Sequence, residues 1–114
     1  MHRSAFLFLA FLLFFLLPFP VAAELKIDRV WEGEYGYGYA LVTFTNTSRT
    51  TFKSSVTIEC VALDAKGNKI NIGNNGFYAF ERGPIGPGFT GTLRVSVNLN
   101  RVKLRSMTCS WRGR

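Results

Sequence analysis

Histidine is almost missing from this chain. Of its 114 residues only His2 is a histidine, and it stands before a long apolar run near the N-terminus. Serine and cysteine nucleophiles commonly depend on a histidine base, and many zinc sites use histidine ligands. A segment that is removed during export cannot supply those groups. The sequence therefore argues against these enzyme classes and against a histidine metal site.

Acidic residues are also few. The chain has seven Asp and Glu residues against 14 Lys and Arg, and its formal net charge is +7. Glycosidases use two carboxylates across a cleft, but a small sandwich has little room for one, and charges on strands usually face water. No other catalytic constellation is apparent. We therefore predict a protein that is not an enzyme, with no catalytic residues, no metal site and no cofactor. The carboxylates considered are Asp28, Glu32, Glu34, Glu59, Asp64 and Glu81.

Long apolar runs are limited to one, and that run predicts export. Residues 5–17 are 13 consecutive apolar residues, which follow a short basic start and are interrupted by two prolines soon afterwards. A membrane-spanning helix needs about 20 apolar residues. A secretory signal has a shorter apolar centre and small residues before its cleavage site, as in Val21-Ala22-Ala23. We predict a cleaved signal peptide over residues 1–23. Retention of this segment as a membrane anchor is the alternative.

Residues 24–114 are predicted to form a single domain. This length supports one modest core, and the segment contains no internal repeat or low-complexity linker. The predicted location is periplasmic or secreted. We expect the chain to contact the membrane only through the signal segment, before cleavage.

Cysteine occurs only twice, and both residues, Cys60 and Cys109, lie in the exported part of the chain. They are too far apart for a Cys-x-x-Cys redox motif, and two sulfurs without histidine make a poor zinc site. An even number of cysteines in a small exported domain favours a disulfide. We predict that Cys60 and Cys109 are bonded and join two core-facing strands. Free buried thiols and a metal site are the alternatives.

Helical periodicity is absent from the exported part, and alternation with a period of two takes its place. The central example is residues 55–63, where apolar residues alternate with their neighbours before a turn rich in Asp, Gly and Asn. We predict an all-β fold, an immunoglobulin-like antiparallel β-sandwich of about seven strands. The expected strands are residues 25–32 with a bulge at Asp28–Arg29, 35–46, 55–63, 70–72, 77–82, 89–99 and 106–111, with a loop at residues 73–76.

The order of these pieces resembles the FxLYD-type immunoglobulin-like domains of small exported bacterial proteins. Asn46-Thr47-Ser48 is similar to their polar turn, residues 60–64 stand where their signature ends a strand, and Pro87-Gly88 resembles their later turn. The chain departs from the signature at Cys60 and Leu63, where the family has Phe and Tyr. The resemblance implies an exported sandwich of mostly unassigned function, and it carries over no catalytic residue.

Three tyrosines recur at every second position, as Tyr35, Tyr37 and Tyr39. Strict alternation places them opposite the core face, in an outward row that is a candidate binding surface. The other face carries glycine and alanine, where a neighbouring element could approach closely. Two structural alternatives stay open. A bulge could turn the tyrosines inward, or the rings could form cross-strand aromatic packing.

Basic residues crowd the last 14 positions, with no acid among them. Such a cluster attracts anionic partners, and it is also typical of edge strands that avoid aggregation. We predict a non-catalytic exported binding or accessory domain whose partner is a protein or an anionic envelope component, and not nucleic acid. The alternative is a secreted effector or inhibitor that binds an anionic surface or an enzyme. The basic candidates are Arg101, Lys103, Arg105, Arg112 and Arg114.

The signal peptide and the disulfide can be checked together by intact-mass analysis of the exported protein. We expect a chain that starts at Glu24 and lacks two hydrogen atoms relative to the reduced form, because oxidation of two thiols removes them. Two alkylatable thiols in the native protein would contradict the disulfide. A mass that includes residues 1–23 would favour the retained anchor.

Overall fold

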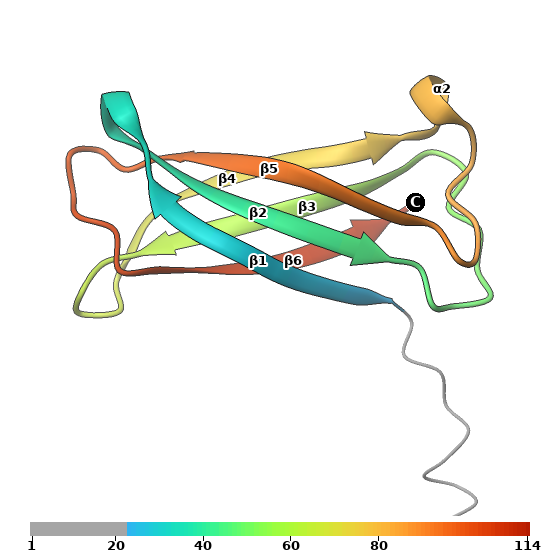
Figure 1. Cartoon of the computed structure of the whole chain (residues 1–114), viewed down its shortest axis with the longest axis horizontal. Coiled ribbons are helices and arrows are strands. Elements are labelled where there is room, and N and C mark those ends of the chain that lie inside the picture. Colours follow the sequence, from blue (N-terminus) through green and yellow to red (C-terminus); the bar gives the residue numbers. More distant parts are fainter. Residues whose placement is uncertain (1–22) are drawn as a thin grey trace, which may run out of the picture.

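The computed structural model describes residues 23–114, which form two antiparallel sheets of three strands that face each other (Figure 1). One sheet has the order β1-β2-β5 and the other has the order β4-β3-β6. The predicted signal peptide falls, apart from Ala23, outside the described residues. The strands are β1 Glu24–Glu32, β2 Tyr37–Thr45, β3 Ser55–Leu63, β4 Lys69–Tyr78, β5 Thr90–Asn98 and β6 Ser106–Gly113, with single helical turns η1 Glu34–Gly36 and α2 Ala79–Arg82.

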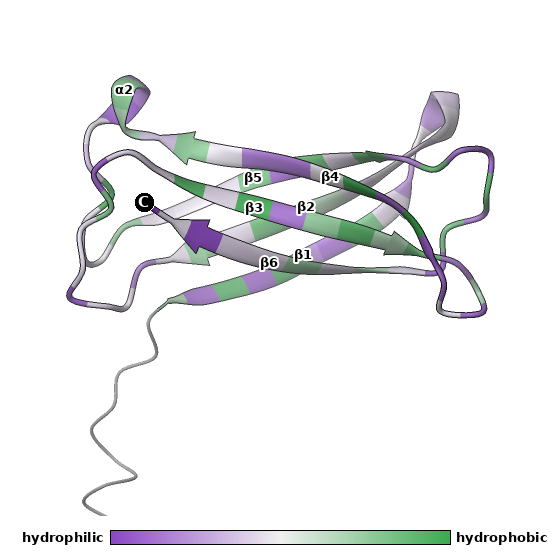
Figure 2. Cartoon of the chain, turned by 180° about the vertical axis from the view of Figure 1, so that it is seen from behind, coloured by the Kyte–Doolittle hydropathy of each residue, from purple (hydrophilic) through white to green (hydrophobic). Residues whose placement is uncertain are grey.

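The core lies between the two sheets, as the alternation predicts. Hydrophobic bands recur along β3 and alternate with polar ones (Figure 2). Every second residue of a strand in an antiparallel sheet can face the core while its neighbours meet water. The predicted pattern over residues 55–63 is confirmed. Fully buried residues of β2, β3 and β5 are Ala40, Val42, Phe44, Val56, Ile58, Cys60, Ala62, Val95 and Val97.

The bulge predicted at Asp28–Arg29 is confirmed. In the pairing of β1 with β2 the register shifts between Ile27 and Arg29. Ile27 then lies opposite Val42, and Val30 lies opposite Ala40, and both partners are fully buried. One extra residue in β1 therefore turns both apolar side chains towards the core.

The described residues form six strands rather than seven, because the loop predicted at residues 73–76 lies inside β4. Glycine at position 73 reflects close packing: a Cβ added there would stand 2.0 Å from the carbonyl oxygen of Ser96 on β5. The side-chain amide of Asn75 also donates to the carbonyl oxygen of Arg94, at 2.8 Å. The residues that look like a turn in the sequence hold β4 against β5.

The strand predicted over residues 77–82 is also corrected. Only its first two residues belong to β4, and Ala79–Arg82 forms the turn α2. The N–H of Gly83 donates to the carbonyl oxygen of Ala79 at 2.6 Å and closes this turn. Gly83 has φ of 85°, a left-handed conformation that glycine adopts without steric cost.

The predicted disulfide between Cys60 and Cys109 is confirmed, and it joins two core-facing strands of the same sheet. The two residues are directly opposite each other in the pairing of β3 with β6, with Cα atoms 4.1 Å apart. In antibody domains the conserved disulfide instead connects the two sheets. Here the bond fixes β6 to the central strand of its own sheet.

Asn46 holds the turn that leaves β2. Its side chain is fully buried, and its amide donates to the carbonyl oxygens of Thr50 at 2.8 Å and Ile85 at 3.3 Å. Its Oδ1 accepts the backbone N–H of Ser48 at 3.1 Å. Residues 46–48 match a glycosylation sequon, but the amide nitrogen is committed to the protein interior. This asparagine therefore acts as a structural residue.

The close contact between β4 and β5 predicts a stability difference between two glycine substitutions. Gly73→Ala should destabilise the domain by about 1–3 kcal/mol, because the added methyl group overlaps backbone that cannot move freely. Gly86→Ala is the matched control, since its Cβ would meet nothing nearer than 3.6 Å. Urea denaturation of both variants measures the effect. Equal stabilities would contradict the role given to Gly73.

Candidate functional site

The two sheets meet differently along their two sides. β4 and β5 are in close contact on one side, whereas β1 and β6 touch at few points on the other. Figures 1 and 2 show β1 and β6 along the same side of the domain. Ile27 of β1 lies opposite the buried Val42 yet is 37% exposed. We call this side, between β1 and β6, the open seam.

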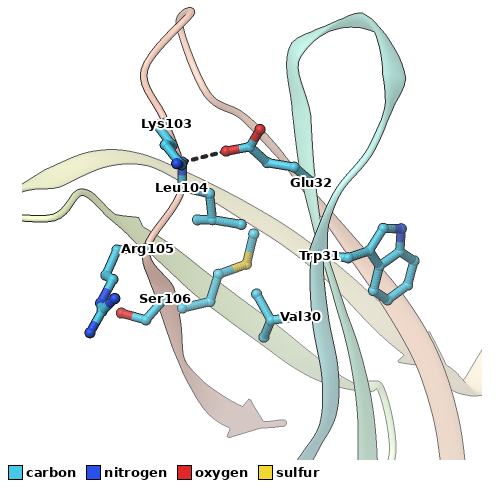
Figure 3. Close-up of a pocket in the computed structure, with 8 residues that line it drawn as sticks. Val30, Trp31, Glu32, Lys103, Leu104, Arg105 and Ser106 are labelled. Carbon is cyan, nitrogen blue, oxygen red and sulfur yellow. Dashed lines mark hydrogen bonds between the residues drawn. The ribbon is translucent and has the colours of Figure 1, made fainter.

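A cleft of about 430 Å³ lies at one end of the open seam. Figure 3 shows Val30 and Leu104 turned towards each other across it, while Trp31 and Arg105 point away. Apolar side chains thus face the interior of the cleft and charged groups stand at its rim. The lining residues are Val30, Trp31 and Glu32 of β1 and Lys103, Leu104, Arg105, Ser106 and Met107.

The floor of the cleft depends on Gly38 of β2. A Cβ at this position would lie 2.8 Å from the terminal methyl of Met107, 3.1 Å from Leu99 and 3.2 Å from Leu104. Three apolar side chains therefore pack onto the backbone of β2 where a side chain is missing. The prediction that this glycine-bearing face admits a close neighbour is confirmed.

Glu32 connects the two sides of the cleft. Its Oε1 accepts the backbone N–H of Leu104, so the end of β1 is joined to the segment before β6 (Figure 3). This segment runs over residues 99–105 and has no regular structure beyond a turn. A hydrogen bond from an amide to a carboxylate is stronger than one between neutral groups. The cleft therefore keeps its shape although no strand pairing joins β1 to β6.

The three tyrosines do not form one row. Tyr35 lies in η1 with φ of 64° and is 92% exposed, so it precedes the strand. Tyr37 is the first residue of β2 and is 39% exposed. Tyr39 is partly buried on the outer face of the same strand. Only Tyr37 and Tyr39 therefore share the outward face that alternation predicts.

Tyr39 is enclosed by its neighbours on the outer face. Its ring centroid lies 5.5 Å from that of Trp31, and the guanidinium of Arg94 lies 4.7 Å from the centre of the ring. Arg29 stacks in turn on Trp31 at 4.6 Å, and a Cβ on Gly33 would overlap the Tyr39 ring. For Tyr39 the geometry matches the cross-strand packing alternative. Its ring faces are occupied by the protein itself.

The basic residues divide into two groups that bracket β6. Arg101, Lys103 and Arg105 precede the strand, while Arg112 and Arg114 lie at its far end, and all five are exposed. At about 3.3 Å per residue, Arg105 and Arg112 are about 23 Å apart along the strand. Within residues 23–114, the one ion pair joins Lys26 to Asp28. The five cations therefore have no carboxylate partner in the described part of the chain.

The sequence predicted the charged residues at the rim of the cleft as binding candidates, but not the apolar residues in its interior. Lys103 and Arg105 are predicted candidates, whereas Val30 and Leu104 are not. One signal was available, because Leu104 is an apolar residue placed between two basic ones in a polar segment. The apposition of β1 and β6 could not be read from local alternation.

The described residues contain neither a cluster of three or more metal-binding side chains nor a helix long and apolar enough to span a bilayer. Compared with protein-family models, curated proteins and solved structures, the chain matches none of them. The likeness to FxLYD-type domains therefore stays a prediction.

The different surroundings of the tyrosines predict different costs of substitution. Tyr39→Ser should destabilise the domain by about 1–3 kcal/mol, because it removes one aromatic pair and one cation–π contact together with buried ring area. Tyr35→Ser should change stability by less than about 0.5 kcal/mol, as exposed substitutions usually do. Denaturant unfolding of the two variants provides the comparison. A neutral Tyr39→Ser variant would return this tyrosine to the candidates for ligand contact.

Proposed function

We propose that this protein is an exported, non-catalytic binding domain that holds an acidic partner protein at the open seam. The supporting observation is the combination of an apolar cleft with five exposed, unpaired cations around β6. A domain that needed these charges only for solubility could distribute them over its surface. Their placement at both ends of one strand edge favours a binding role.

The charge pattern indicates the chemistry of the partner. Uncompensated basic groups attract anions over a distance and speed their encounter with the protein. The cleft beside Lys103 and Arg105 has apolar side chains at its floor, which a simple polyanion cannot use. An acidic protein that also presents apolar side chains satisfies both features. It could be an accessory partner in the envelope or an enzyme that this domain inhibits.

Export is part of the proposal. The disulfide between Cys60 and Cys109 is consistent with an oxidising compartment, where such bonds persist. The apolar run at residues 5–17 supplies the signal that reaches this compartment. Both features support a periplasmic or secreted location.

The proposal is tested by neutralising the basic group beside the cleft, as Arg101→Gln, Lys103→Gln and Arg105→Gln together. The probe is a ten-residue peptide of alternating valine and glutamate. The dissociation constant should rise about tenfold at low salt, because three exposed charge interactions contribute about 0.5 kcal/mol each. The loss should shrink at high salt, where exposed charges are screened.

The matched control removes three exposed cations elsewhere, as Lys69→Gln, Arg82→Gln and Arg94→Gln, with the same change in net charge. It should shift the dissociation constant by less than about twofold, since these groups lie on β4, α2 and β5, away from the open seam. Equal effects of the two triple variants would contradict a localised site. If the domain bound phosphatidylglycerol vesicles but not the peptide, the partner would be an anionic envelope surface and not an acidic protein.

A further inference from the structure

We propose that the free edge of β6 binds an extended acidic segment of the partner as an added β-strand. The inference rests on the proposed function, and it specifies how the open seam recognises its partner. Within residues 23–114, β6 pairs on one side with β3 and with no strand on the other. An edge strand presents a row of unpaired backbone groups that can template another strand.

The register shows which backbone groups of β6 are free. Antiparallel pairs alternate between close pairs, with Cα atoms about 4.5 Å apart and no mutual hydrogen bonds, and wider pairs that exchange two bonds. Cys60 and Cys109, at 4.1 Å, are a close pair. Ser55 and Arg114, an odd number of steps away, exchange bonds of 2.9 and 3.2 Å, as the alternation requires. The two observations agree on the phase of the ladder.

The N–H and C=O groups of Met107, Cys109 and Trp111 therefore point away from β3, towards the open seam. Those of the alternate residues of β6 point to β3. The same three residues have side chains directed to the core side of the sheet, since their partners Ala62, Cys60 and Ile58 are buried. An added strand would place alternate side chains over this core side.

This geometry defines the sequence of the segment that fits. Residues opposite Met107, Cys109 and Trp111 would face the open seam, where Ile27 is exposed, so they should be apolar. The residues between them would face outward, on the same side as Arg112 of β6. An acidic side chain opposite Arg112 would meet its guanidinium, and an acidic residue at the other end of the segment would lie near Arg105. An alternating apolar and acidic segment of about seven residues spans the strand between Arg105 and Arg112.

The charges also exclude a second copy of this chain as the favoured occupant. Two β6 strands paired edge to edge would bring two sets of the same cations together, and like charges across a strand pair are destabilising. Basic residues on an edge thus prevent self-association. The same residues attract a strand of opposite charge. The same basic residues can therefore both prevent self-association and attract an acidic partner.

The other sheet edges are less suitable. β4 is held against β5 by the contact of Gly73 with Ser96 and by the hydrogen bond of Asn75. β1 carries both signs of charge along its length, and it is bulged at Asp28. A bulge disrupts the regular ladder that an added strand needs. The edge of β6 has a uniform charge and no register shift in its pairing with β3.

Amide hydrogen exchange measured by NMR tests the proposal with the intact exported domain and the valine–glutamate peptide. In the free protein the amides of Met107, Cys109 and Trp111 should exchange fast, and those of Thr108, Ser110 and Arg112 slowly, because only the latter bond to β3. With nine tenths of the protein bound, exchange at the first three should slow by about tenfold, since it then occurs from the free tenth.

Peptides methylated on backbone nitrogen provide the decisive control, since they keep sequence and charge. Methylation at alternate residues on one edge of the peptide should abolish binding, and methylation on the opposite edge should leave it within about twofold, because an added strand uses one edge only. Equal tolerance of both methylations, or binding without slower exchange at Met107, Cys109 and Trp111, would overturn strand addition.

The two proposals fail in distinguishable ways. A peptide that binds through the basic cluster without changing these amides would leave the proposed function standing and remove the added strand. A peptide of alternating valine and glutamate that does not bind would overturn both. If a peptide of alternating valine and lysine bound with the same affinity as the valine–glutamate peptide, charge complementarity would have no role in binding.

Discussion

The close approach of β4 to β5 determines the shape of the domain. Gly73 and the carbonyl oxygen of Ser96 are so near that no side chain fits between them. Two sheets of three twisted strands that are drawn together along one side separate along the other, because the twist rotates successive strands. The core lies between the two sheets, and the open seam is the side, between β1 and β6, where the sheets do not close.

Local patterns in the sequence were sufficient for the core and for most of the strands. The alternation in β3, the bulge at Asp28 and the disulfide all depend on residues near in sequence or on a simple pairing of two cysteines. Residues 73–76 were misread because glycine and asparagine favour turns locally. In the folded chain their small size and side-chain amide serve a contact with a strand about twenty residues away. Tertiary contact overrode local preference at this point.

The candidate site was predictable only in part for the same reason. Charge clusters are visible in a sequence, so the cations around β6 could be named. Their separation into two groups depends on the length and direction of β6, and the cleft depends on which strand ends beside Leu104. The tyrosine row failed at Tyr35, because Tyr35 and Gly36 both have positive φ, of 64° and 79°, in the turn before β2. Two residues in this conformation shift the start of the strand without changing its alternation.

The disulfide has a mechanical consequence. It lies near the middle of β6 and ties this strand to the central strand of its sheet. A pull exerted sideways on β6 would load its hydrogen bonds to β3 one pair at a time, as in the opening of a zip. The covalent link stops that opening halfway, so the strand cannot be peeled off while the bond is intact. A force applied to the edge strand β6 would thereby be transmitted to β3 in the interior of the domain.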